Sequence, residues 1–366
     1  MKLVNDIPTS ISCSLNILPP TEENIPFPTL DHSTFTFIDL FAGIGGFRLG
    51  LQAVGGKCVF SSEWNEAAAS VYSDNFGETP FGDITKETVK SHIPRQFDLL
   101  SAGFPCQPFS ISGHMKGFED TRGTLIYDVF DIMNRHRPPV VLLENVKHLK
   151  YHDGGRTLSV ILSNIRKMGY SVDWRILNAT SFGVPQNRER IIIIATLGRP
   201  FDFSHLEQLK PDNTLRLADY LDADGTFEYM DEPYTLLEHP RRQRSGLIFA
   251  GYRNKKTRKN GTRPNTEHLS RVHKQPNRIY STEGVHPALP SQETSGRFFI
   301  LHQGQVRKLT ITECYRIMGF PEEYRRHNAL SEQYRQIGNS VCVPMVEAIG
   351  RAVSYTHLTL PTTPYV

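Results

Sequence analysis

Short apolar stretches alternate with segments of helical periodicity over the first 200 residues of the chain. The apolar stretches are rich in β-branched and aromatic side chains, as buried strands are, and lie at 35–41, 57–62, 97–102, 140–143, 172–177 and 191–195. Helices are expected between them, with apolar residues three or four positions apart, at 47–54, 124–137 and 158–168. Strands that alternate with helices pair in parallel, so we predict an α/β fold with a doubly wound, mostly parallel sheet over residues 34–200.

The pattern fades after Pro200. Residues 201–328 are polar, basic and irregular, with short strands expected at 280–285 and 295–301. We interpret this region as a smaller, irregular domain that contains β-structure.

The last quarter of the chain contains two further helices. One is expected to begin after Thr310, which can cap it, because Glu313 stands three residues further on. Residues 334–341 are expected to form a glycine turn before a final amphipathic helix at 343–353.

The two ends of the chain differ from the rest. Residues 1–33 are rich in Pro, Thr and Asn without any sustained period, and we expect a loosely attached extension. Residues 354–366 have an unrelated composition, and we interpret them as a non-native tail that does not continue the last helix.

Positive charge is concentrated in one part of the chain. Residues 241–280 contain 12 Lys and Arg and one acidic residue, whereas the whole chain has a net charge of +3, so the remainder carries −8. A basic segment on an acidic body favours a polyanionic partner such as nucleic acid. A solvated or disordered basic loop is the alternative, although this segment also contains apolar and aromatic residues.

The sequence gives no support for a membrane protein, a secreted protein or a metal-binding protein. No apolar run approaches the ~20 residues of a membrane span, and the N-terminus has no signal-peptide pattern. The five cysteines lack disulfide-framework or metal-ligand spacing, so we expect a reducing, cytoplasmic setting and no metal: Cys13, Cys58, Cys106, Cys314 and Cys342.

Cys106 lies in an unusual turn after the expected strand at 97–102. Pro105 and Pro108 have a fixed φ and no N–H, so neither a helix nor a strand can continue past them. Open α/β folds bind ligands at such strand ends, and a thiol there is exposed and oriented as a nucleophile must be. A small buried apolar residue is the alternative for any single free cysteine. The long polar segment that follows, 111–123, is typical of a loop that closes over a site.

A glycine turn follows the first expected strand. Gly43, Gly45 and Gly46 allow close approach of a ligand to the backbone, and Glu63, 20 residues after Gly43, can accept hydrogen bonds from ribose hydroxyls. The turn is tighter than that of dinucleotide-binding proteins and suits a nucleoside without a pyrophosphate, such as S-adenosylmethionine. Asp83, at another expected strand end, can accept from an adenine amino group, or can be an ordinary turn aspartate.

Charged residues also mark the last two strands of the expected sheet. Glu144 ends a fully apolar strand, where a carboxylate is costly unless paired or protonated, so it is a candidate general acid; a helix cap or solvated strand end is the alternative. Arg188 and Arg190 lie two residues apart before a buried strand and are expected to point the same way, to anchor a planar ligand or to form structural ion pairs.

Six motifs in this order resemble those of the DNA (cytosine-5)-methyltransferases of the bacterial restriction–modification type. The resemblance covers about residues 34–353, and its motifs lie at 37–46, 103–110, 144–146, 186–190, 307–321 and 336–341. It implies the Rossmann-like fold of S-adenosylmethionine-dependent methyltransferases, with 34–200 as the catalytic domain, 201–328 as the target-recognition domain and 329–353 returning to the catalytic domain.

The resemblance also implies roles for matching positions. Cys106 would attack C6 of a flipped-out cytosine, Glu144 would bind or protonate N3, and Arg190, with Arg188 beside it, would hold O2. S-adenosylmethionine would lie against Phe41, Gly43, Gly45, Glu63, Trp64, Asp83, Ile84, Pro105, Asn339 and Val341. Double-stranded DNA would contact Gln107, Ser110, Ser112, Arg122, Arg253, Lys255 and Arg297. We expect a monomer that acts on the nucleoid, with a separate restriction endonuclease as a candidate partner.

Three alternatives remain open. A tRNA cytosine-5 methyltransferase would use the same chemistry, but the large basic region argues against it. A nicotinamide-dependent dehydrogenase would leave the cysteine turn without a purpose. A catalytically inactive DNA-binding homologue would not need Cys106, Glu144 and Arg190 together.

Overall fold

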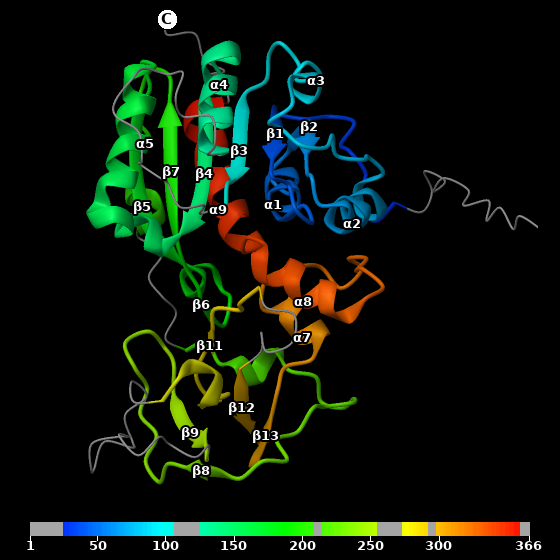
Figure 1. The fold of residues 1–366 in the computed structure, drawn as a ribbon, viewed down its shortest axis with the longest axis vertical. Helices are drawn as coiled ribbons and strands as arrows, with labels where there is room; N and C mark the ends of the chain where they lie inside the picture. Colours follow the sequence, from blue (N-terminus) through cyan, green and yellow to red (C-terminus); the bar gives the residue numbers. More distant parts are fainter. Residues whose placement is uncertain (1–24, 106–124, 208–213, 255–272, 292–297, 359–366) are drawn as a thin grey trace, which may run out of the picture.

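The structure is a computed structural model that describes residues 25–105, 125–207, 214–254, 273–291 and 298–358. Its larger part is built on a six-stranded sheet, and its smaller part, below it in Figure 1, on a five-stranded sheet. The strands of the larger sheet are, in spatial order, β2 (Gly56–Ser62), β1 (Phe35–Leu40), β3 (Leu99–Gly103), β4 (Val140–Val146), β7 (Glu189–Thr196) and β5 (Ser171–Asn178).

Strands β2, β1, β3 and β4 pair in parallel, and β7 runs antiparallel to both of its neighbours. The connection from β5 to β7 is too short for the crossover that a parallel pair requires, which accounts for the reversed strand. The prediction of a doubly wound, mostly parallel sheet is confirmed.

Helices cover both faces of this sheet because its central strands are apolar on both sides. Val141 and Leu143 of β4 belong to the core that contains α4 (Leu125–His136) and α5 (Arg156–Lys167). Val140 and Leu142 belong to the opposite core, which contains α1 (Gly46–Gln52) and α9 (Val343–Val353). The last helix of the chain therefore packs beside the first one, and Gly50 of α1 allows this closeness, since a Cβ there would lie 2.7 Å from Val346.

The smaller sheet is assembled from short strands that all lie between residues 234 and 307 of the sequence. They are β13 (Gln305–Arg307), β12 (Phe299–His302), β10 (Arg278–Ser281), β9 (Phe249–Arg253) and β8 (Tyr234–Leu236). The short strands expected at 280–285 and 295–301 correspond to β10 and β12, which overlap these ranges only in part. A two-stranded parallel pair, β6 (Gln186–Asn187) with β11 (His286–Pro287), connects the two parts. The remaining short helices are α2 (Glu66–Phe76), α3 (Glu87–Lys90), α6 (Ser204–Glu207), α7 (Ile311–Arg316) and α8 (Leu330–Asn339).

The prediction of a glycine turn at 334–341 is wrong, because Gly338 lies inside helix α8. Gly338 is required for packing rather than for a turn. A Cβ there would lie 2.1 Å from the carbonyl oxygen of Pro290, so only glycine lets the helix approach that segment.

The two ends of the described chain are attached to the body more firmly than we expected. Phe27 packs against Phe76 and Tyr324, and its backbone N–H donates to Asn75. At the other end, Ser354–Leu358 continue α9 as a π-helical turn, and Arg199 donates to the carbonyl of Thr356. The expectation that the tail does not continue the helix is therefore wrong for these residues, while residues 359–366 lie outside the described part.

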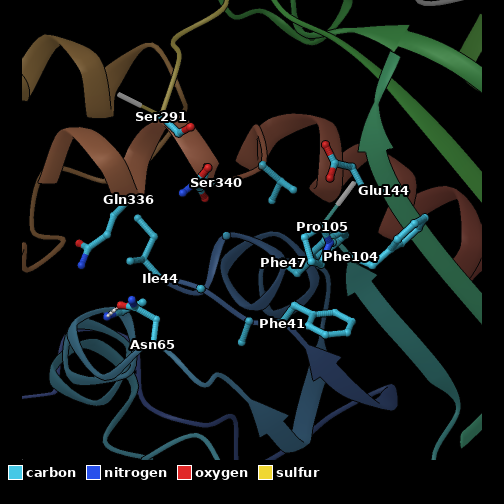
Figure 2. A pocket seen from close by; sticks show the side chains of 18 of the residues that line it. Phe41, Ile44, Phe47, Asn65, Phe104, Pro105, Glu144, Ser291, Gln336 and Ser340 are labelled. Atoms are coloured by element: carbon cyan, nitrogen blue, oxygen red, sulfur yellow. Dashed lines mark hydrogen bonds between the residues drawn. The ribbon is translucent and has the colours of Figure 1, made fainter. Parts of the chain in front are cut away.

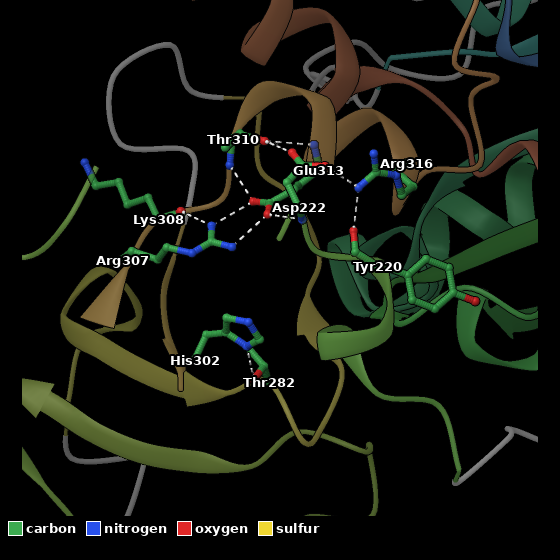
Figure 3. Close-up of polar contacts among 9 residues, drawn as sticks. All are labelled: Tyr220, Asp222, Thr282, His302, Arg307, Lys308, Thr310, Glu313 and Arg316. Atoms are coloured by element: carbon green, nitrogen blue, oxygen red, sulfur yellow. Dashed lines mark hydrogen bonds and ion pairs between the residues drawn. The ribbon is translucent and has the colours of Figure 1, made fainter. Parts of the chain in front are cut away.

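A buried ion pair joins the smaller sheet to helix α7 (Figure 3). Arg307, the last residue of β13, makes a bidentate contact with Glu313, and the two side chains are 3% and 0% exposed. Thr310 and Glu313 form the predicted capping box, in which each side chain accepts from the other's backbone N–H. The Glu313 carboxylate also accepts from the backbone of Asp222, so one buried charge organises three segments.

Replacing Glu313 with Gln should destabilise the protein by about 3–5 kcal/mol, since it leaves the guanidinium of Arg307 buried without a counter-ion. Urea denaturation followed by circular dichroism would measure this. Glu347, which forms an exposed pair with Arg351, is the control, and its replacement with Gln should cost less than about 1 kcal/mol. Equal losses in the two variants would contradict the role of the buried pair.

Candidate active site

A cavity of about 700 Å³ lies where the carboxyl ends of β1, β2, β3 and β4 meet the C-terminal part of α8 (Figure 2). Open α/β sheets bind their ligands at this edge, and the volume is typical of a small-molecule site. The sheet side contributes residues 41–44, 46, 47, 63–65, 68, 103–105, 144–146 and Arg190, while 289–291 and most of 335–341 form the opposite wall.

The glycine turn and Glu63 form one side of the cavity. Gly43 and Gly45 have φ of +54° and +80°, in the left-handed region that glycine adopts readily. The N–H groups of Gly43 and Asn65 donate to the two oxygens of Glu63, each at 2.8 Å, and hold the carboxylate at the cavity edge. Burial raises the pKa of Glu63, while these hydrogen bonds oppose the rise. A carboxylate fixed in this way can accept hydrogen bonds from a ligand's hydroxyl groups.

Seven of the ten residues expected to hold a cofactor line the cavity, and they are Phe41, Gly43, Glu63, Trp64, Pro105, Asn339 and Val341. Trp64 is 74% exposed, which is unusual for so large an apolar side chain and leaves one ring face free to cover a planar ligand.

The other three residues lie outside the cavity lining. Gly45 packs against Phe76, where a Cβ would lie 2.2 Å from the ring. Asp83 accepts from the backbone N–H of Thr85, and Ile84 is buried in the core. The strand expected before Asp83 is reduced to a single bridge between Phe81 and Ser62.

Glu144 and Arg190 face each other at the other end of the cavity. Nε of Arg190 lies 2.9 Å from Oε1 of Glu144, and the side chains are 14% and 13% exposed. Burial raises the pKa of Glu144, and the charge of Arg190 opposes the rise. The second carboxylate oxygen lies toward Gly103, where a Cβ would come within 3.7 Å of it. The carboxyl group of Glu144, whose pKa is raised, and the guanidinium of Arg190 can therefore contact the same ligand.

Arg188 does not share this position, which corrects the sequence expectation. Strand β7 begins only at Glu189, so the alternation of side chains within a strand does not extend to Arg188. Its guanidinium is buried and donates to the carbonyl oxygens of Leu289, Gly338 and Ser340 at 2.6–3.0 Å. Burial lowers the pKa of Arg188. Arg188 therefore joins the two segments of the opposite wall instead of lining the cavity.

The expected nucleophile follows the cavity lining directly in sequence. Pro105 lines the cavity, and Cys106 lies outside the described residues, as do Gln107, Ser110, Ser112, Arg122, Lys255 and Arg297. Of the expected DNA contacts, Arg253 is described: it ends β9 on the smaller sheet, pairs with Glu232 and lies over the ring of Phe299.

The sequence motifs indicated no role for Asn145. Its side chain is buried and donates to the carbonyl of Phe104 at 2.8 Å, so it holds the backbone two residues before Cys106. The sequence feature that could have indicated this role is the position of Asn145 next to Glu144 in the same motif. Leu289–Ser291, from the smaller part, also line the cavity, and no local pattern indicated them.

The family model for C-5 cytosine-specific DNA methylases matches residues 35–355, which include every described residue that lines the cavity. The chain belongs to this family. It is therefore a DNA (cytosine-5)-methyltransferase, and the family predicted from the motifs is confirmed.

Curated relatives of this methylase share most of its length. The Type II methyltransferase M.HpaII of Haemophilus parainfluenzae is 43% identical over 328 residues, which cover 87% of this chain and 89% of the relative. M.HhaI of Haemophilus parahaemolyticus, also a Type II methyltransferase, is 40% identical over 86% of this chain and 92% of its own.

Solved structures support the fold. The Dnmt2 methyltransferase of S. pombe aligns over 88% of this methylase and 97% of its own chain, with a TM-score of 0.60 and 18% identity. A putative DNA modification methyltransferase from an E. coli prophage aligns over 89% and 100%, with a TM-score of 0.59 and 22% identity.

Neither a membrane helix nor a metal cluster is found in the part of this methylase that the structure describes. No helix there has the length and apolarity to cross a bilayer, and no three His, Cys, Asp or Glu side chains group in a way that could hold a metal ion.

Asp39 is a fully buried carboxyl group beneath the glycine turn, two residues before Phe41. One oxygen accepts from Ser101 at 3.2 Å, and the other has no partner among the described residues. Burial raises the pKa of Asp39 from an ordinary 3.8 to about 7, against the lowering effects of Ser101 and Arg48. The unfolded chain thus ionises Asp39 at a lower pH than the folded protein does.

Replacing Asp39 with Asn should stabilise the protein more at pH 8 than at pH 5. Below pH 3.8 the carboxyl is neutral in both states and has no effect; as pH rises to about 7 the unfolded state loses its proton first, and stability falls. Asn cannot ionise, so the variant should avoid a loss of at most about 4 kcal/mol. Urea denaturation at both pH values measures the difference. A stability change in the variant that is the same at pH 5 and pH 8 would contradict the raised pKa.

Proposed function

We propose that this methylase transfers a methyl group from S-adenosylmethionine to C5 of a cytosine flipped out of double-stranded DNA, through a covalent bond between Cys106 and C6. The observation that carries the proposal is the Glu144–Arg190 pair at the cavity end beside Pro105, because Cys106 is the next residue in the chain. The residues at the opposite end of the cavity suit a nucleoside.

The residues that line the cavity fit S-adenosylmethionine. Two backbone N–H groups orient the carboxylate of Glu63 so that it can accept from hydroxyl groups. The exposed ring of Trp64 can cover a planar group. A Cβ on Gly43 would have no atom within 4 Å, so there is room for a ligand beside the backbone. When bound, this cofactor supplies an electrophilic methyl group. We keep Asp83 and Ile84, which lie outside the cavity lining, as candidates for adenine contacts.

The chain's own residues would perform the remaining chemistry. The Cys106 thiolate adds to C6, which converts C4–C5 of the ring into a nucleophilic enamine, and Glu144 donates a proton or hydrogen bond at N3 so that negative charge does not build up. Arg190 holds the base through O2. After C5 has taken the methyl group, loss of the C5 proton expels the cysteine. The raised pKa of Glu144 favours the proton-donating form that this role needs.

Binding of DNA would be divided between the two parts of the chain. We propose residues 34–200, completed by 329–353, as the catalytic domain and 201–328 as the target-recognition domain, whose basic segment contacts phosphates. The loop after Cys106, with Gln107, Ser110, Ser112 and Arg122, would close over the extruded base, and Arg253, Lys255 and Arg297 would contact the duplex. Unstacking the base costs roughly a few kcal/mol, which these contacts would offset.

Restriction–modification is the proposed setting. The relatives that are 40–43% identical over most of their length are Type II methyltransferases, which supports a role beside a separate restriction endonuclease. We further propose that the enzyme acts as a monomer on DNA in the cytoplasm.

DNA that contains 5-fluorocytosine should trap the protein covalently in the presence of S-adenosylmethionine, because fluorine at C5 cannot leave as the proton does. A gel-stable complex should form with the wild type and with Cys314→Ala, whose thiol is buried in the core, but not with Cys106→Ala.

The same assay separates DNA from tRNA as substrate. An adduct in the Cys106→Ala protein would remove Cys106 from its role. An adduct with fluorinated tRNA and none with DNA would replace the proposed substrate with tRNA.

Replacing Glu144 with Gln should lower kcat by about 10²–10⁴-fold, the range expected for losing a general acid, with a small effect on DNA binding. Transfer of a radioactive methyl group and DNA gel shifts would measure the two quantities. Glu189→Gln is the matched control, since Glu189 pairs with Lys147 outside the cavity and its loss should leave kcat within about threefold. An unchanged kcat in Glu144→Gln would refute the acid role.

A further inference from the structure

Gln336 presents a buried carboxamide without hydrogen-bond partners. The residue is 6% exposed, and neither its Nε2 nor its Oε1 has a partner among the described residues. Burial of an amide without partners is unfavourable, and native proteins nearly always satisfy such groups. The side chain lines the cavity, so a ligand there can supply the missing partners.

Packing and hydrogen bonds hold the backbone that carries Gln336 in place. Gly338 is in close contact with Pro290, and Arg188 donates to the carbonyls of Gly338 and Ser340. These contacts hold the end of α8 against the cavity. Figure 2 shows the side chain of Gln336 extending from α8 toward Asn65 on the opposite wall, at the end of the cavity away from Glu144.

The neighbouring carboxylates already have partners. Both oxygens of Glu63 accept backbone N–H groups, and Glu144 is paired with Arg190. Arg335 also lines this end, and its guanidinium is paired with Glu332. The oxygen of Asn65 caps α2 by accepting from Ala68, which leaves its amide nitrogen as a donor for the cavity. The amide nitrogens of Gln336 and Asn65 therefore favour a hydrogen-bond acceptor of the ligand, such as a carboxylate, at this end of the cavity.

We propose that Gln336 binds the amino-acid end of the methyl donor, with its NH₂ group donating to the α-carboxylate. This inference rests on the proposed function. The donor has three polar parts, of which the ribose suits Glu63 and the adenine suits the face of Trp64. The amino-acid part combines an acceptor and a donor, and a carboxamide is complementary to both.

The proposal is tested with two ligands that differ only at that end. S-adenosylhomocysteine carries the amino-acid group, whereas 5′-methylthioadenosine lacks it. Isothermal titration calorimetry with the full chain should show that Gln336→Met, which conserves volume, weakens S-adenosylhomocysteine binding roughly tenfold to a hundredfold, as expected for one hydrogen bond to a charged group. Binding of 5′-methylthioadenosine should change less than about twofold.

Gln333→Met is the matched control. Gln333 lies one helical turn earlier in α8, outside the cavity lining, and donates to the carbonyl of His327. Its replacement removes an amide from the same helix and should leave both affinities unchanged. A loss of affinity for S-adenosylhomocysteine in this control as large as that in Gln336→Met would assign the effect to helix packing and overturn the proposal.

Gln336→Glu tests the sign of the ligand's charge and provides a second variant if Gln336→Met does not fold. A carboxylate there would repel the ligand carboxylate, so S-adenosylhomocysteine should bind more weakly than to Gln336→Met. Binding as tight as that of the wild type, or tighter, would identify the ammonium as the partner and overturn the proposal.

The remaining outcomes separate this inference from the function on which it rests. Equal losses for both ligands in Gln336→Met would place the amide on the nucleoside, and no loss for either would leave it without a ligand; each overturns the proposal alone. Failure of the wild type to bind either ligand would overturn the proposed cofactor as well.

Discussion

The buried guanidinium of Arg188 binds segments that lie 101–152 residues further along the sequence. It extends from the turn before β7 to the carbonyl of Leu289, in the segment that returns from the smaller sheet, and to two carbonyls at the end of α8. A desolvated cation is costly unless its donors find acceptors, so all three segments must be in place for the charge to be tolerated. The cavity wall opposite the sheet depends on this contact, because residues 289–291 and 335–341 form that wall. Gln186 strengthens the same junction through hydrogen bonds to Ile317 and Leu289.

The sheet supplies the opposite wall by a different principle. Parallel strands bring their carboxyl ends to one edge, so residues that follow β1, β2, β3 and β4 meet there although they are far apart in sequence. The two carboxylates at this edge, Glu63 and Glu144, have different surroundings. Glu63 is fixed by backbone N–H groups and keeps its orientation toward a neutral part of a ligand. Glu144 is paired with Arg190 and is also influenced by the charge of Arg188, yet burial outweighs both and raises its pKa.

The smaller sheet is attached through a second buried charge pair. Arg307 and Glu313 bind each other, and Glu313 also caps α7 and accepts from the backbone of Asp222 (Figure 3). Helix α7 in turn packs into the core that contains Ile44 and Leu289, which lie beside the cavity. The smaller sheet is therefore connected to the wall of the cavity through buried contacts.

Local patterns in the sequence determined the strands of the larger sheet, the helices α1, α4, α5 and α9, and the capping box of Thr310 and Glu313. They also indicated that the glycine turn and Glu63 lie at one site, but they did not predict helix α2. The strands and helices follow from the periodicity of apolar side chains, and the capping box follows from the three-residue spacing of Thr310 and Glu313. The motif order also identified the family, and the structure brings Glu144 and Arg190 into contact.

Only the tertiary structure decided which residues complete the site. Arg188 lies two residues from Arg190, yet its partners come from segments more than 100 residues away. Gly338 was expected to form a turn, but its lack of a side chain serves contact with Pro290. Gln336 begins the last motif, but its role was not evident there, because an unpaired amide matters only once folding has removed its water without replacing it. Periodicity reports which face of an element is buried, whereas the partner across that face is set by the packing of the whole chain.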